Sequence, residues 1–361
     1  MTRTLRTASA ALLAAAMAGS AATASAGIVV DYSLDQTGLF SSNAAARAAV
    51  EAAAADLNTV LDLNLTAIDN PTIVGAAGPN GRSTVTLDLQ GEATIPDSPA
   101  TTGTIPLVVA QNEFRIYAGG ALIEGTTLGK GGSGGIGVGI GISVVTESEY
   151  AAATRTAEAD ANTLLNRGEG PVIGTLNSDL GQTPISLAFG PTFGQLSFDV
   201  DTDNDGVQDS AAALDAYWSF DHTADVEAGQ NDFYSVALHE MLHTLGIGSS
   251  ETWASLVSGS DWLGDELAAL TAGGFGVINT DDDDDDAHFT SDLQGLIYGT
   301  AVLQEAVMDP TLTVGTRKLL TDLDVAALAD IGYSVVAVPE PTSVALVGIG
   351  AAVLLRRRRS A

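Results

Sequence analysis

The 361-residue sequence contains no cysteine, which excludes a disulfide framework, a thiol nucleophile and a cysteine-containing propeptide that could cap a zinc ion. Basic residues are also scarce, since 14 Lys and Arg stand against 45 Asp and Glu, for a formal net charge of −31. Such a charge repels nucleic-acid phosphates and anionic lipid, so nucleic acid is not an expected partner. The apolar content of 45% is ample for a buried core, which excludes a disordered protein.

The first 26 residues have the pattern of a signal peptide. Arg3 and Arg6 give a positive start, an apolar run covers residues 10–18, and Ala-Ser-Ala at 24–26 offers small residues for cleavage. A core helix is the alternative, but this run of Ala and Leu lacks amphipathic spacing. We expect export and cleavage after Ala26.

The C-terminus combines Pro-Glu-Pro at 339–341, an apolar stretch at 344–355 and four arginines at 356–359. The stretch is shorter than the ~20 residues of a membrane-spanning helix, and the arginines would stay cytoplasmic. Residues 337–361 resemble the PEP-CTERM sorting signal of exported bacterial proteins. The resemblance implies recognition by an exosortase-type enzyme, removal of the tail, and delivery to the cell envelope or extracellular polymer. Contact with the membrane would be transient, with a permanent anchor as the alternative.

Residues 27–336 contain no long Pro/Ser linker and no regular repeat, so one domain is expected. Helices are predicted over 43–61, with Ser41 or Ser42 as N-cap, and over 147–165.

Strand patterns predict a mixed sheet beside the first helix, giving an α+β fold. The strand-like segments are 83–89, 114–117 and pieces of 187–200. The segment 129–141 is so rich in glycine that it predicts a loop or an irregular edge.

Two acidic segments are candidates for calcium. One reads Asp201-x-Asp203-x-Asp205-Gly206, with Asp209 at the ninth position, and resembles the front half of a calcium loop. The bidentate glutamate expected at position twelve is replaced by Ala212, which favours a solvated acidic turn over a calcium site. The run 281–286 repels itself and predicts a solvated loop.

The segment 231–245 has the apolar content of a buried helix and contains His239-Glu240-x-x-His243. Two histidines four apart lie one turn above each other, so His239 and His243 can share one zinc ion. Glu240 points beside them, where it can serve as general base toward water at the metal. The same pattern also occurs by chance on core helices.

Gly246 follows His243 at the third position, and the run from His239 to Gly246 resembles the start of the extended metzincin motif. The compact motif has a third histidine three residues after the glycine, where this chain has Ser249, a poor zinc ligand. Four histidines occur in the chain, which leaves His222 and His288 as candidates for the third ligand.

The order of helix, third ligand and methionine favours His288 over His222. Met308, in Ala-Val-Met-Asp-Pro at 306–310, resembles the methionine turn beneath the metal of metzincins, and 318–333 looks like the family's C-terminal helix. A distant third histidine before this turn resembles the leishmanolysin-like branch. Pro310 stands two residues after Met308, so the tyrosine that some metzincins use as an extra ligand is missing.

This resemblance implies an upper subdomain of about 27–247, with a mixed sheet and the active-site helix, and a smaller lower subdomain of about 248–336. The cleft would lie between them, with the acidic run on its rim. Three imidazoles leave a fourth zinc position open, which is typical of catalytic sites. The sequence thus predicts a secreted zinc-dependent endopeptidase acting on a peptide or protein substrate.

Two other interpretations remain at this point. A non-catalytic envelope or biofilm-matrix protein with a metzincin-like fold would carry the same sorting signal, although it would have no structural reason to keep Glu240. A surface domain stabilised by calcium, without zinc, is the third interpretation.

Overall fold

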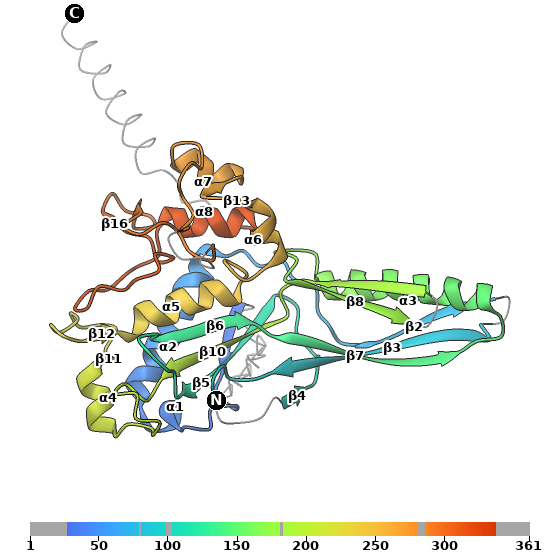
Figure 1. Cartoon of the computed structure of the whole chain (residues 1–361), viewed down its shortest axis with the longest axis horizontal. Helices are drawn as coiled ribbons and strands as arrows, with labels where there is room; N and C mark the ends of the chain where they lie inside the picture. The colour runs from blue at the N-terminus through green and yellow to red at the C-terminus, as the bar shows by residue number, and fades with distance from the viewer. Residues whose placement is uncertain (1–26, 79–80, 99–102, 181–182, 281–285, 337–361) are drawn as a thin grey trace, which may run out of the picture.

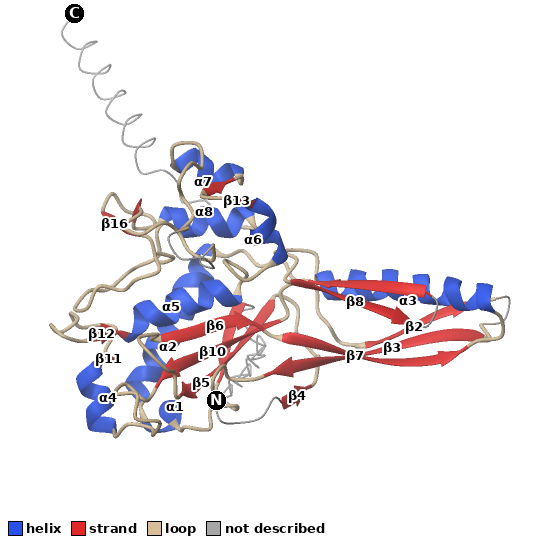
Figure 2. Cartoon of the chain, viewed as in Figure 1, coloured by secondary structure: helices blue, strands red, loops and turns tan. Residues whose placement is uncertain are grey.

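The computed structural model describes residues 27–78, 81–98, 103–180, 183–280 and 286–336 (Figure 1). The predicted signal peptide, the sorting segment and most of the acidic run lie outside these residues. Within them the fold is α+β, with eight helices and several small sheets (Figure 2). None of the described helices is long and apolar enough to span a bilayer.

A four-stranded sheet and two helices form the centre of the molecule. The sheet has the order β1-β5-β10-β6, in which the first three strands are parallel and β6 is antiparallel to β10 at the edge. Its strands are β1 (Gly27–Asp31), β5 (Glu113–Ala121), β6 (Gly129–Ser133) and β10 (Phe193–Asp199). Helices α2 (Ala44–Val60) and α5 (Phe233–Thr244) pack against each other and against this sheet.

Alanines on one stripe of α2 explain this close packing. Ala46, Ala49 and Ala53 are fully buried, and their small side chains bring the helix near its neighbours. The helix is confirmed, but its cap is not Ser41 or Ser42, because Asn43 Oδ1 accepts the backbone N–H groups of the first turn. The two serines instead lie within a short preceding helix, α1 (Leu39–Ser42).

A second group of elements forms a lobe that projects to one side of the central sheet (Figure 1). It comprises β2 (Thr72–Ala77), β3 (Ser83–Ala93), β4 (Gly103–Ile105), β7 (Gly135–Ser143), α3 (Glu147–Asn166), β8 (Gly174–Leu180) and β9 (Thr183–Phe189). Val85, Leu87 and Leu89 of β3 point into a separate hydrophobic cluster beneath α3, as their alternation predicts. The prediction of one sheet is wrong, because β3 and β9 pair outside the central sheet.

For 129–141 the predictions were a loop or an irregular edge. The loop is wrong, because these residues form β6 and most of β7. The edge position is confirmed, because within the described residues both strands lie at the edge of their sheets. At Gly131 the absence of a side chain serves close approach between backbones rather than flexibility. A Cβ on Gly131 would lie 2.2 Å from the carbonyl oxygen of Glu240, so only glycine lets β6 lie directly against α5.

The segment after α5 lies on the other side of that helix from the central sheet (Figure 1). It contains α6 (Glu251–Leu256), α7 (Asp265–Leu270), α8 (Asp322–Asp330) and the hairpins β13–β14 (Val257–Ser258, Asp261–Trp262) and β15–β16 (Gln294–Leu296, Leu303–Glu305). Before α5 stand α4 (Ala211–Tyr217), β11 (Trp218–Ser219) and β12 (Asn231–Asp232). Helix α8 is shorter than predicted, because Thr321 and Asp324 form a capping box at its start.

Candidate metal centre

Helix α5 is fixed at both ends. At its start, Asp232 accepts hydrogen bonds from the backbone N–H and the hydroxyl of Ser235 and pairs with Arg317 at 2.7 Å. At its end, Gly246 adopts a φ of 108°, a value that L side chains rarely reach. A Cβ there would also lie 2.8 Å from Cγ of Pro171. The chain therefore leaves α5 sharply at a position that only glycine fits.

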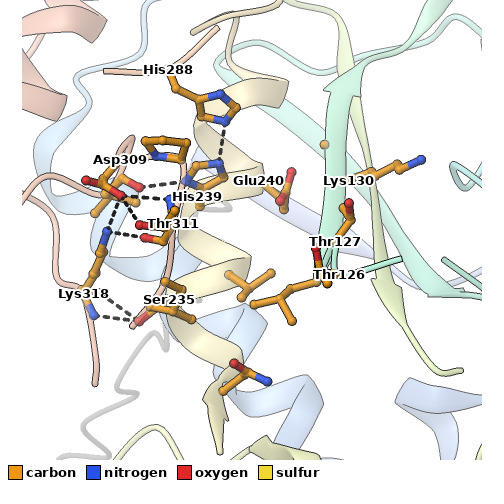
Figure 3. Close-up of a pocket in the computed structure, with 18 of the residues that line it drawn as sticks. Thr126, Thr127, Lys130, Ser235, His239, Glu240, His288, Asp309, Thr311 and Lys318 are labelled. Carbon is orange, nitrogen blue, oxygen red and sulfur yellow. Dashed lines mark hydrogen bonds and ion pairs between the residues drawn. The ribbon is translucent and has the colours of Figure 1, made fainter. Parts of the chain in front are cut away.

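The structure brings His239, His243 and His288 together at one point. Their Nε2 atoms form a triangle with sides of 3.1, 3.2 and 3.2 Å. His239 and His243 come from successive turns of α5, and His288 comes from the chain between α7 and β15. Figure 3 shows the rings of His239 and His288 facing each other beside the helix.

Backbone carbonyls set the orientation of two of these rings. Nδ1 of His239 lies 2.7 Å from the carbonyl oxygen of Val307, and Nδ1 of His243 lies 2.8 Å from that of Ile247. A carbonyl only accepts, so each Nδ1 carries a proton, and each ring, when neutral, turns a lone pair at Nε2 toward the other ring. Two lone pairs at 3.2 Å repel unless a cation lies between them.

The donor set fits zinc. Three nitrogens at ~2.0–2.1 Å from one ion in tetrahedral geometry stand about 3.3 Å apart, close to the observed triangle. Burial, together with the neighbouring His243 and His288, holds the pKa of His239 well below its usual range, so this ring stays neutral as a ligand must be.

Glu240 lies in the same cavity but outside the triangle (Figure 3). It is 7% exposed, and burial raises the pKa of its carboxyl group to about 8 against the lowering effect of the Gly131 backbone N–H and of Lys130. Gly131 therefore has two roles: it leaves space for α5, and its backbone N–H donates to Glu240.

The backbone of Val307 and Met308 ties the ligands to α8. Both backbone N–H groups donate to the carboxylate of Asp324, each at 3.1 Å. The Val307 carbonyl holds His239, while the Met308 carbonyl accepts the N–H of Phe289, next to His288. Met308 is fully buried, and its contribution to the site is this backbone contact and packing.

A cavity of about 890 Å³ opens in front of the histidines (Figure 3). Its walls come from residues 126–131 at β6, from α5, and from the segment 307–318. Lys318 lines it with Nζ 3.3 Å from carboxylate oxygens of Glu305 and Asp309.

The rejected third-ligand candidates lie elsewhere. His222 lines a separate hollow with Tyr234 and Arg317. The Ser249 hydroxyl donates to the carbonyl of His243 at 2.5 Å, which ties down the end of α5.

Three of the four candidate calcium ligands come together. Carboxylate oxygens of Asp201, Asp203 and Asp205 lie within 4.8 Å of one another. Asp201 also accepts the backbone N–H groups of Asp205 and Gly206, as in a tight turn. Asp209 instead accepts hydrogen bonds from the backbone and hydroxyl of Thr202.

Sequence reasoning missed the roles of Asp324, Lys318 and Gly131. The Thr321-x-x-Asp324 spacing signals a capping box, but the bonds from Asp324 to Val307 and Met308 depend on long-range packing. The glycine-rich segment 129–141 was visible in the sequence, yet only the position of α5 shows that Gly131 makes room for the Glu240 backbone.

Comparison with known proteins identifies one feature, the C-terminal segment. Residues 337–359 match the PEP-CTERM protein-sorting motif. The chain therefore carries the motif of exported proteins that are sorted to the cell envelope, which implies recognition by an exosortase-type processing enzyme. No curated protein and no solved structure matches the chain.

Proposed function

We propose that this protein is a secreted zinc-dependent endopeptidase of the metzincin type. The observation that carries the proposal is the Nε2 triangle of His239, His243 and His288 with the Glu240 carboxyl group beside it in an open cavity. Three neutral imidazoles that leave a fourth position open, with a carboxyl group beside them, are typical of catalytic zinc sites, since a closed structural site would use a fourth protein ligand.

The residues of the site have two different roles, metal binding and proton transfer. His239, His243 and His288 would hold the ion, which when bound supplies Lewis acidity toward water and the scissile carbonyl. Glu240 takes the proton of the attacking water and returns it to the leaving amine. A zinc ion held by the three histidines would favour the ionised form of Glu240, and would so oppose the effect of burial on its pKa.

The metzincin assignment is supported by the order of parts along the chain. Helix α5 ends just before Gly246, the third histidine follows, and then the buried Met308 lies in a backbone turn held by α8. Antiparallel β6 is the edge strand of the central sheet and borders the cavity. In this assignment the upper part of the cleft is β6 with α5, and the lower part is the segment 307–318.

Substitution of Glu240 tests the proposal. Glu240→Gln keeps the side-chain shape and removes the basicity, so zinc content should stay unchanged while hydrolysis of an unstructured protein such as casein falls by about 10²-fold or more. His222→Gln is the matched control, because His222 lies outside the cavity, and it should retain full activity. Full activity in the Glu240 variant would remove this residue from the mechanism.

A non-catalytic envelope or matrix protein is the competing function. It would bind zinc equally well but hydrolyse no protein substrate. Zinc-loaded wild-type protein that leaves casein intact over long incubation would favour that function.

A further inference from the structure

Within the part of the chain that the structure describes, strand β7 has one edge without a strand partner. It pairs with β3 along its whole length, from Gly135 opposite Glu92 to Ser143 opposite Thr84. Among the described residues, β3 is the only strand that pairs with β7. The outer edge therefore presents backbone donors and acceptors that can pair with a further strand.

This edge lacks the usual protection against pairing. Exposed edge strands normally carry charge, proline or a bulge, whereas β7 reads GIGVGIGIS and contains neither charge nor proline. Its β-branched side chains lie on the same sheet face as the buried Val85 and Leu87, yet Ile140 is 39% and Ile142 is 52% exposed. The chain has a net charge of −31, so this uncharged apolar edge differs in character from the acidic chain that carries it.

The sequence of β7 is nearly the same in both directions about Gly139. If two copies pair antiparallel around a two-fold axis at that residue, Val138 faces Ile140 and Ile136 faces Ile142. Every apolar side chain then meets an apolar one, and every glycine from 137 to 141 meets a glycine. Cross-strand pairs of β-branched residues stabilise a sheet, and a two-fold axis requires this self-complementarity.

We propose that β7 is a homodimer interface, in which the sheet of one copy continues through β7 into the sheet of a second copy. A second copy is the occupant that the strand itself specifies, because the required partner is uncharged, extended and β-branched at alternate positions. The lobe that carries β7 projects away from α5 and the metal centre (Figure 1), so pairing leaves the cavity open. The inference is independent of the peptidase function.

Charge at the two-fold axis tests the register. Gly139 is exposed, and a Cβ there would lie 3.5 Å from Cβ of Asp88, an ordinary contact, so a side chain fits one copy. Exported wild-type protein should have the mass of two chains in light scattering after size exclusion. Gly139→Glu places two carboxylates opposite each other and should weaken the dimer about tenfold or more. Gly139→Lys should do the same, and a mixture of both variants should form a heterodimer.

Val74→Glu is the matched control, because it adds the same charge to β2, on the glycine face of the same sheet, and should leave the dimer intact. Circular dichroism of each variant shows that the lobe is folded. A monomeric wild type, a dimer that neither Gly139 variant weakens, or failure of the folded Glu and Lys variants to pair with each other would each overturn the proposal. A monomer that instead binds an extended peptide of another protein at β7 would also overturn it.

Discussion

Asp324 and His239 hold opposite ends of the same residue, Val307. The Asp324 carboxylate accepts the Val307 N–H at 3.1 Å, and the Val307 carbonyl oxygen lies 2.7 Å from Nδ1 of His239. A carboxylate at the start of α8 thereby orients an imidazole on α5. Groups that orient metal ligands in this way tune affinity without touching the metal.

Asp324→Asn should therefore weaken zinc binding by about 10- to 100-fold. The amide cannot accept from Val307, Met308 and Thr321 as two carboxylate oxygens do, so His239 loses its fixed orientation. Competition with a chromogenic chelator measures the affinity. Asp330→Asn is the control on the same helix, because Asp330 bonds to Trp262 and the start of α7. Asp330→Asn should lower the melting temperature and leave zinc affinity unchanged. If both variants lost zinc affinity equally, Asp324 would have only a structural role.

Gly131→Ala should lower activity and stability together. The new Cβ would lie 2.2 Å from the Glu240 carbonyl oxygen, so β6 must move away from α5, at a cost of about 1–3 kcal/mol. The backbone donor to Glu240 moves with it. Gly132→Ala is a neighbouring control, because a Cβ at Gly132 meets no atom within 4 Å. Thermal melts and casein hydrolysis compare the two variants, and equal behaviour would contradict the close approach of β6.

The metal-free protein should lose stability as the pH falls below about 6.5, the ordinary histidine pKa. Burial and its histidine neighbours keep the pKa of His239 well below that value in the fold, whereas the unfolded chain takes up the proton. Stability is thus present above the unfolded pKa and is lost toward the folded pKa, by at most about 1.4 kcal/mol per pH unit. Denaturant titrations of chelator-treated protein should show a smaller pH slope for His239→Gln than for wild type.

Local patterns in the sequence predicted the elements that carry the ligands. The apolar content of 231–245 and Gly246 gave α5 and its end, and the alternation in 83–89 gave the buried face of β3. The projecting lobe and the strands at 129–141 were not predictable in this way, because glycine does not favour strands, and only the position of α5 shows that Gly131 must lack a side chain.

The candidate site, like the fold, could be predicted only in part. His239 and His243 follow from helical spacing, whereas the position of His288 rests on contacts between segments distant in the chain, such as Phe289 N–H to the Met308 carbonyl. The link from Asp324 through Val307 to His239 likewise depends on tertiary packing, which periodicity does not encode.

The zinc content of the exported protein tests the account most directly. Elemental analysis of protein purified without added metal should find one zinc per chain. His288→Ala should lose it, because two imidazoles on α5 cannot hold the ion alone, while His222→Ala should retain it. A wild-type protein without zinc, or one whose zinc survives the loss of His288, would contradict the metal centre proposed for this chain.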